Sequence, residues 1–221
     1  MQLNDWEQVR DWLDANYTVS ARIAEQINTG KYPQDAFTLG QMASKAWLLK
    51  HLESVNTLGV TVSILGNWIG TLVDPMLRQH TGIERVYGID LDPEAVALSE
   101  ELNAHWHQHF WRYKGVVADV TMLDSSLQVF ETSGELIEVK PDIIINTSAE
   151  HMDNHWFRTA DTDQLVIMQT NSNPDLAGHV NPCTSIDDMI YRYPMATGSI
   201  AVEFQMPNYT RFMQIGYPAH D

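Results

Sequence analysis

The sequence predicts an α/β domain with a mostly parallel sheet, preceded by a helical extension and closed by an antiparallel hairpin at its C-terminal end. Two observations carry this prediction. From Thr61 onward, short apolar segments alternate with helix-like segments, which is typical of parallel strands joined by crossover helices. Near the end of the chain, two alternating segments (198–206 and 211–218) are joined by the polar turn PNYT, which is typical of a hairpin.

Residues 1–57 form the expected helical extension. Apolar residues between Trp6 and Leu13 recur at the spacing of one helix face. After the break GKYP, a second helix is expected from Thr38 to Leu52, with its apolar residues facing inward. The remaining residues, 58–221, are expected to form one domain, because they contain every strand signal in the chain.

Five parallel strands and two helices are expected in this domain. The strands are expected at 61–65, 85–89, 114–118, 142–146 and 164–169. Helices at 70–80 and 93–110 would join the first three strands, because the periodicity changes there from the strand pattern to the helix pattern.

The composition limits the ligand and the location. The chain has 13 Lys and Arg against 29 Asp and Glu, a net charge of −16. Affinity for nucleic acids depends on clustered basic residues, and no three occur in a row, so neither nucleic acid nor an acidic membrane surface is an expected partner. A small molecule or a protein is expected instead.

The predicted location is the cytoplasm. This prediction rests on the single Cys183, the lack of a bilayer-spanning apolar segment and the lack of a secretory signal. The oligomeric state is not indicated.

The most specific motif joins the first two expected strands. The first strand ends in the turn GNWIG, from Gly66 to Gly70, and the second ends at Asp90. Gly66 permits a sharp turn and close approach of a ligand to the backbone. Asp90 follows at about the 20-residue spacing of an acid that binds ribose hydroxyls. Asn67 and Trp68 stand where a dinucleotide-binding loop has glycines, which favours an adenosine ligand without a pyrophosphate.

This layout resembles the class I S-adenosylmethionine (SAM)-dependent methyltransferases. ILGNWIG is similar to their Gly-rich first motif, YGIDLDPEAVALSEELN to the segment with the ribose-binding acid, VVADVTML to the adenine-contacting segment and PDIIINTSAEHM to the fourth strand with its catalytic loop. NTSAEHM and TRFMQIG are also similar to phage-encoded methyltransferase-like proteins, for which the location would be a host cytoplasm. The resemblance covers residues 58–217 and implies a Rossmann-like three-layer sandwich that binds SAM. The cofactor contacts that it implies are Gly66, Asn67, Trp68, Gly70, Asp90, Leu91, Asp92, Asp119, Val120 and Asn146.

The candidate catalytic residues follow the fourth strand. Asn146 lies where ligands of open α/β sheets bind, although it could simply close a turn. The loop NTSAEHM lacks the Pro and aromatic residue of amino-methylating relatives, so methylation of adenine or cytosine is not expected. Glu150 or His151 could take a proton from the methyl acceptor. His151 and His155 would share a face if 149–157 were helical, but no third ligand can be placed, so no metal is expected.

The expected function is transfer of the SAM methyl group to an oxygen or nitrogen of a small molecule or protein. Lys45, on the helix before the first strand, could pair with the SAM carboxylate or be solvated. Two alternatives remain: other SAM chemistry at the same site, such as aminocarboxypropyl transfer or SAM cleavage, and a non-catalytic binding protein on a degenerate methyltransferase scaffold. A nicotinamide-dependent oxidoreductase is disfavoured, because it would more often continue with a sixth parallel strand.

Overall fold

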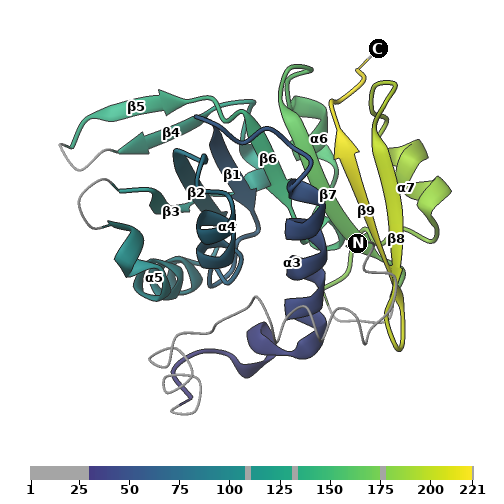
Figure 1. The fold of residues 1–221 in the computed structure, drawn as a ribbon, viewed down its shortest axis with the longest axis horizontal. Coiled ribbons are helices and arrows are strands. Elements are labelled where there is room, and N and C mark those ends of the chain that lie inside the picture. The colour runs from purple at the N-terminus through teal and green to yellow at the C-terminus, as the bar shows by residue number, and fades with distance from the viewer. Residues whose placement is uncertain (1–29, 108–110, 131–133, 175–177, 221) are drawn as a thin grey trace.

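The computed structural model describes residues 30–107, 111–130, 134–174 and 178–220. Most of their strands form one seven-stranded sheet in the order β3-β2-β1-β6-β7-β9-β8 (Figure 1). These strands are β1 (Thr61–Leu65), β2 (Arg85–Asp90), β3 (Tyr113–Val117), β6 (Ile143–Asn146), β7 (Leu165–Asn171), β8 (Ile200–Gln205) and β9 (Thr210–Gly216). The helices are α3 (Leu39–Leu52), α4 (Val73–Gln79), α5 (Pro93–Leu102), α6 (His155–Thr159) and α7 (Ile186–Arg192).

The strand pairing confirms the predicted sheet. β1 pairs in parallel with β2 and β6, β2 with β3, and β6 with β7. β9 runs antiparallel to both β7 and β8, so the C-terminal hairpin closes the sheet as expected. All seven predicted strands are present, and their bounds differ from the predicted ones by a residue or two.

Both predicted helices of the domain are shorter than expected. The helix expected over 70–80 is α4, which begins only at Val73. The helix expected over 93–110 ends at Leu102, and a short 3-10 helix, Ala104–His107, follows it. The helix ends because the amide of Asn103 donates hydrogen bonds to the carbonyl oxygens of Ser99 and of the turn residue Gly70.

The connection between β3 and β6 contains a second, two-stranded sheet that the sequence prediction missed. Its strands, β4 (Leu127–Phe130) and β5 (Leu136–Val139), pair antiparallel. Leu127 and Val129 are buried and alternate with exposed residues. This hairpin therefore packs one apolar face against the domain in the place of a crossover helix.

The main sheet has an apolar core on each face, which makes three layers. α3 and α4 cover one face, where Trp47, Leu48 and Met76 pack with residues of β1, β6 and β7. α6 and α7 cover the other face together with the β4–β5 hairpin, where Phe157 and Tyr193 lie in the second core. None of the helices in the described ranges is long and apolar enough to cross a membrane.

The described part of the predicted N-terminal extension packs directly on the sheet. Thr38 precedes α3 as expected, although its hydroxyl donates to the Asp35 carbonyl and does not cap the helix. Met42, Trp47, Leu48 and other inward-facing residues of α3 are buried as predicted. The helical segment expected between Trp6 and Leu13 lies outside the described residues.

Candidate functional site

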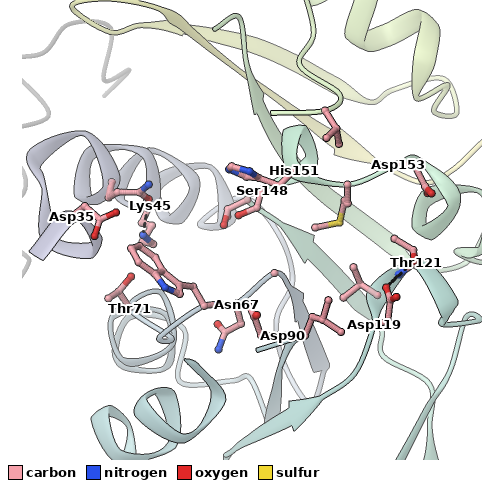
Figure 2. A pocket seen from close by; sticks show the side chains of 18 residues that line it. Asp35, Lys45, Asn67, Thr71, Asp90, Asp119, Thr121, Ser148, His151 and Asp153 are labelled. Carbon is pink, nitrogen blue, oxygen red and sulfur yellow. Dashed lines mark hydrogen bonds between the residues drawn. The ribbon is translucent and has the colours of Figure 1, made fainter. Parts of the chain in front are cut away.

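A cavity of about 780 Å³ opens at the carboxyl ends of the parallel strands, where ligands of open α/β sheets bind (Figure 2). Its size is typical of small-molecule and cofactor sites. Lys45 and Asp119 lie toward opposite ends of the cavity, with Asp90, Ser148 and His151 between them. The residues singled out from the sequence that line it are Gly66, Asn67, Trp68, Asp90, Leu91, Asp119, Val120 and His151.

The turn after β1 is held in a strained conformation by Asp90. Gly66 and Gly70 have positive φ angles of 62° and 71°, which glycine adopts freely. Trp68 has a φ of 48°, and no other non-glycine residue of the described chain has a positive φ. The Asp90 carboxylate accepts a hydrogen bond of 2.7 Å from the Trp68 N–H. Strain of this kind is typical of binding sites.

The Asn67 side chain fastens the turn to the protein interior. Its amide Nδ2 donates to the Ser99 hydroxyl and to the Tyr113 hydroxyl, both at 3.0 Å. Burial raises the pKa of Tyr113 far above its usual value, so this hydroxyl keeps its proton. Gly88 leaves the necessary space, because a Cβ atom there would lie 2.2 Å from Asn67 Nδ2. The Asn67 side chain is therefore accommodated in the interior, where it joins the turn to Ser99 of α5 and Tyr113 of β3.

We expect Gly88→Ala to lower the free energy of unfolding by about 1–3 kcal/mol, because the added methyl group would overlap the Asn67 amide and the Tyr113 hydroxyl. Urea denaturation measures the change. Gly40→Ala on α3 is the matched control, since its nearest contact would be an ordinary 3.6 Å, and it should be neutral or slightly stabilising. Equal urea midpoints for Gly88→Ala and the wild type would contradict this account of the turn.

The acids after β2 and β3 differ in what their carboxylates bind. Asp90 accepts from the Asp92 N–H as well as from the turn. Asp92 caps α5 through a main-chain N–H of its first turn and does not line the cavity. Asp119 accepts from the side chain and the N–H of Thr121, and these hydrogen bonds lower the pKa of Asp119. Leu91 is 67% exposed at the cavity and offers an apolar surface there.

Three further residues predicted for the site lie behind the cavity wall. Gly70 packs against α5, where a Cβ atom would meet the Ser99 hydroxyl at 2.0 Å. Asn146 is fully buried, and its side-chain oxygen accepts from the Ser148 N–H at 2.9 Å, so its amide closes the turn after β6. Glu150 is only 3% exposed. The cavity wall beside them consists of Thr147, Ser148 and His151.

The N-terminal extension contributes lining residues to the cavity, and of these the sequence indicated only Lys45 as a candidate. Lys45 is 8% exposed, so it is not a solvated lysine. Its Nζ donates to the Gln41 side chain at 3.1 Å. Burial, together with the nearby Arg211 guanidinium, lowers the pKa of Lys45 to about 7. Gln41 and Asp35 also line the cavity. Gln41 and Lys45 reach the strand ends because α3 docks on the sheet, and Asp35 lies in the short 3-10 helix Gln34–Phe37 that precedes α3. No local pattern in the sequence signals this docking.

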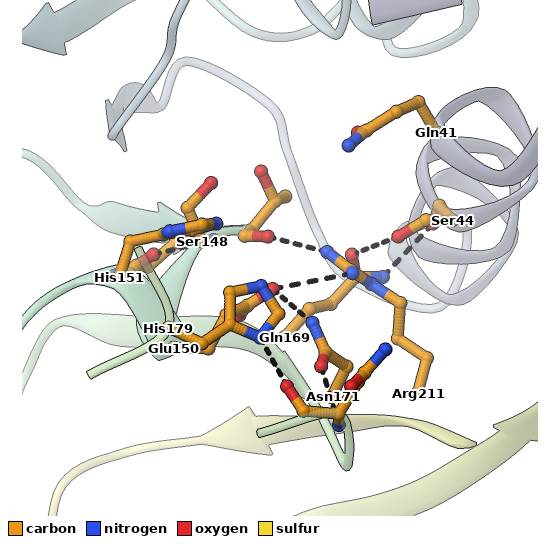
Figure 3. A network of polar contacts seen from close by, with 12 residues as sticks. Gln41, Ser44, Ser148, Glu150, His151, Gln169, Asn171, His179 and Arg211 are labelled. Carbon is orange, nitrogen blue, oxygen red and sulfur yellow. Dashed lines mark hydrogen bonds and ion pairs between the residues drawn. The ribbon is translucent and has the colours of Figure 1, made fainter. Parts of the chain in front are cut away.

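A buried polar cluster adjoins the cavity beside His151 (Figure 3). Glu150 Oε1 accepts from the Asn171 amide at 2.6 Å and lies 3.6 Å from Arg211 Nη1. Arg211 also donates to the Thr147 carbonyl at 2.6 Å. A cationic guanidinium and a carboxylate are thus paired directly behind the loop that lines the cavity, and the pairing fixes that loop to β9.

The helix considered over 149–157 does not form. A 3-10 helix, Ala149–His151, is separated from α6, so His151 and His155 do not share a helix face. The reason is that Met152 leaves the helical conformation and the Asp153 carboxylate accepts from the His155 N–H, which starts a new helix. The residue that lies beside His151 is His179, with ring centroids 4.7 Å apart.

No sequence model of a known protein family matches the chain. A curated relative, ribosomal protein L11 methyltransferase from Aliivibrio salmonicida (strain LFI1238), is 31% identical over 113 residues. The match covers 45% of this chain and 38% of the relative, so the chain spans well under half of the relative's length.

Solved structures are similar over most of the chain. The magnesium protoporphyrin IX methyltransferase of Synechocystis PCC 6803 with bound SAH has a TM-score of 0.58 and 15% identity, covering 96% of this chain and 99% of that one. The ribosomal protein L11 methylase of Lactobacillus delbrueckii subsp. bulgaricus has a TM-score of 0.53 and 11% identity, with 81% of each chain covered. The predicted Rossmann-like three-layer sandwich is confirmed, and the chain has the fold of these SAM-dependent methyltransferases.

Proposed function

We propose that the protein is a SAM-dependent methyltransferase that acts on an oxygen or nitrogen of a small molecule or protein. The observation that supports this most strongly is the meeting of the strained turn, Asp90 and Asp119 on one cavity of a methyltransferase fold. The residues present fit SAM. Asp90 would hold the ribose hydroxyls, Leu91 and Asp119 the adenine, and Lys45 the carboxylate of the methionine part.

The residues after β6 would handle the acceptor. SAM supplies an electrophilic methyl group on a sulfonium, so the protein mainly has to align the nucleophile with it. Ser148 and His151 line the cavity between the adenosine end and the Lys45 end. His151 Nδ1 lies 3.1 Å from the Gly178 carbonyl, which can only accept, so the proton of the neutral ring is on Nδ1. Its Nε2 can then receive a proton from the acceptor.

The acceptor is proposed to be a small molecule or a protein. The net charge of −16 argues against direct nucleic-acid binding, because phosphate contacts need clustered basic residues. A cytoplasmic location and a division into residues 1–57 as an extension and 58–221 as the SAM-binding domain complete the proposal. The described part of the extension supports this division, since Asp35, Gln41 and Lys45 border the cavity without contributing a strand.

Product analysis with methyl-labelled SAM tests the proposed reaction. The purified protein is incubated with labelled SAM and fractionated cell extract, and the products are separated. Methyl transfer leaves S-adenosylhomocysteine and a labelled acceptor, which is the expected result. Methylthioadenosine or homoserine derivatives would show aminocarboxypropyl transfer or SAM cleavage instead. Tight SAM binding with no turnover in any fraction would favour the non-catalytic scaffold.

We expect SAM binding at pH 8 to take up close to one proton. Lys45, with a pKa of about 7, is mostly neutral in the free protein at this pH, and pairing with a carboxylate favours its charged form. Calorimetric titrations in buffers of different ionisation enthalpy measure the uptake. Lys45→Met should bind SAM more weakly and without proton uptake. An uptake that persists in this variant would place the carboxylate elsewhere.

The lowered pKa of Lys45 also predicts how the free energy of unfolding changes with pH. The pKa of Lys45 falls from 10.5 in the unfolded chain to about 7 in the folded one, so the unfolded state binds more protons between these values. The free energy of unfolding should therefore gain a rising contribution from Lys45 as the pH goes from about 7 to 10.5. Urea denaturation of the wild type and of Lys45→Met across this range measures it, and parallel curves would contradict it.

A further inference from the structure

Three potential metal ligands meet at the edge of the cavity. Glu150, His151 and His179 each offer one ligand atom, and these atoms lie within 4.8 Å of one another. They come from the loop after β6 and from the loop after β7, and Figure 3 shows their side chains side by side. Two imidazoles and one carboxylate are a known ligand set for Zn²⁺ and related first-row divalent metals.

The hydrogen bonds of both histidines leave the same ring atom free. His151 Nδ1 lies against the Gly178 carbonyl, and His179 Nδ1 lies against the Asn173 carbonyl. A carbonyl oxygen only accepts, so each Nδ1 carries the proton and each Nε2 presents a lone pair. Metal-binding histidines typically have this arrangement, in which a backbone carbonyl fixes the tautomer and the ring orientation.

The Glu150 carboxylate provides a second, independent indication that a cation binds here. Its Oε1 atom is engaged by Asn171 and Arg211, whereas Oε2 is buried and has no hydrogen-bond partner among the described residues. A buried carboxylate oxygen without a partner is costly, and a cation at this position would satisfy it. Arg211 pairs with Oε1 of Glu150 and not with Oε2. Its positive charge would weaken the binding of a cation nearby, but the guanidinium does not occupy the position beside Oε2.

The two loops are fixed to each other by main-chain hydrogen bonds. The N–H groups of Val180 and Asn181 both donate to the Glu150 carbonyl at 2.9 Å. His179 is therefore held beside Glu150 and His151 by the backbone on its C-terminal side. Such pre-organisation favours metal binding, because little ordering is needed when the ion arrives.

We propose that Glu150, His151 and His179 bind a first-row divalent metal ion of the Zn²⁺ type, with its open coordination position toward the cavity. This replaces the expectation of no metal, which depended on a third ligand that the sequence could not place. The metal would occupy the Nε2 lone pair of His151, so His151 could act as the base only in the metal-free protein. If the proposed methyltransferase function holds, the ion itself would favour loss of the proton from an acceptor oxygen or nitrogen bound to it. Metal binding itself does not depend on that function.

Calorimetric titration of the metal-free full-length protein with Zn²⁺, without SAM, tests the proposal. One equivalent should bind in a defined transition. His151→Gln and His179→Gln should each weaken this binding at least tenfold, since each removes one of three ligands. His155→Gln is the matched control, because His155 is exposed on the neighbouring α6, and its affinity should equal that of the wild type.

The outcomes separate this proposal from the proposed function. No saturable Zn²⁺ binding by the wild type would overturn the metal site, and so would equal affinity of the wild type and the two ligand variants. Circular dichroism checks that both variants fold, and either folded variant alone is sufficient for the comparison. SAM affinity is titrated separately, so a protein that binds SAM but not Zn²⁺ would keep the proposed function and lose only the metal.

Discussion

Asp90→Ala should weaken SAM binding about a hundredfold or more. A carboxylate that accepts hydrogen bonds from both ribose hydroxyls would contribute about 1.5–3 kcal/mol for each, and losing them removes this much binding free energy. The substitution also releases the N–H groups of Trp68 and Asp92, which the carboxylate holds in the free protein. The strained turn that forms the cavity wall would then lose its support. Calorimetric titration with SAM measures the affinity.

The matched control for Asp90→Ala is Asp163→Ala. Asp163 has a side chain that is 73% exposed and pairs with Lys140 outside the cavity, so this variant loses the same charge without touching the site. It should bind SAM like the wild type. Thermal unfolding of both variants distinguishes a lost contact from a lost fold. Binding by folded Asp90→Ala within threefold of the wild type would mean that Asp90 does not hold the ribose.

His151→Gln is expected to lower the turnover rate by about a hundredfold to ten-thousandfold once an acceptor is known. This is the range for loss of a group that moves a proton in the rate-limiting step. The SAM dissociation constant should hardly change, because Asp90 and Lys45 are proposed to hold the cofactor. His151 is proposed to contact the methyl acceptor. Single-turnover rates at saturating SAM, measured beside separate binding titrations, provide the test.

His155→Gln should keep the wild-type rate, since His155 is exposed and does not line the cavity. A rate for His151→Gln within threefold of the wild type would remove His151 from the reaction. Glu150 is unsuitable for the same comparison. Its removal leaves the buried Arg211 guanidinium without its carboxylate, and a lost rate could then reflect a displaced loop.

The sequence allowed the main sheet to be predicted because its strands are short apolar segments bounded by turns. The β4–β5 hairpin was missed because each strand has only four residues, and four residues of alternation are a weak signal. The length of α5 was misjudged because the apolar and aromatic pattern continues past Leu102. Asn103 ends the helix through contacts with Gly70, which is distant in the sequence.

The residues of the candidate site also fall into two groups: those that local sequence pattern identifies, and those that only tertiary contacts bring to the cavity. Gly66, Asp90 and Asp119 were found because each follows a strand at the carboxyl edge of the sheet, and local pattern is sufficient there. Lys45 reaches the cavity only because α3 docks on the sheet. His179 reaches His151 because a loop folds back onto the Glu150 carbonyl. Neither event has a fixed spacing in the sequence, so both belong to tertiary structure.

Calorimetric titration of the wild-type protein with SAM, S-adenosylhomocysteine and NAD tests the central claim most directly. The strained turn, the acid after β2 and the fold together predict micromolar binding of both sulfur ligands and none of NAD. That result would establish the cofactor and justify the search for an acceptor. Absence of binding by both SAM and S-adenosylhomocysteine would contradict the account and favour a non-catalytic protein on a methyltransferase scaffold.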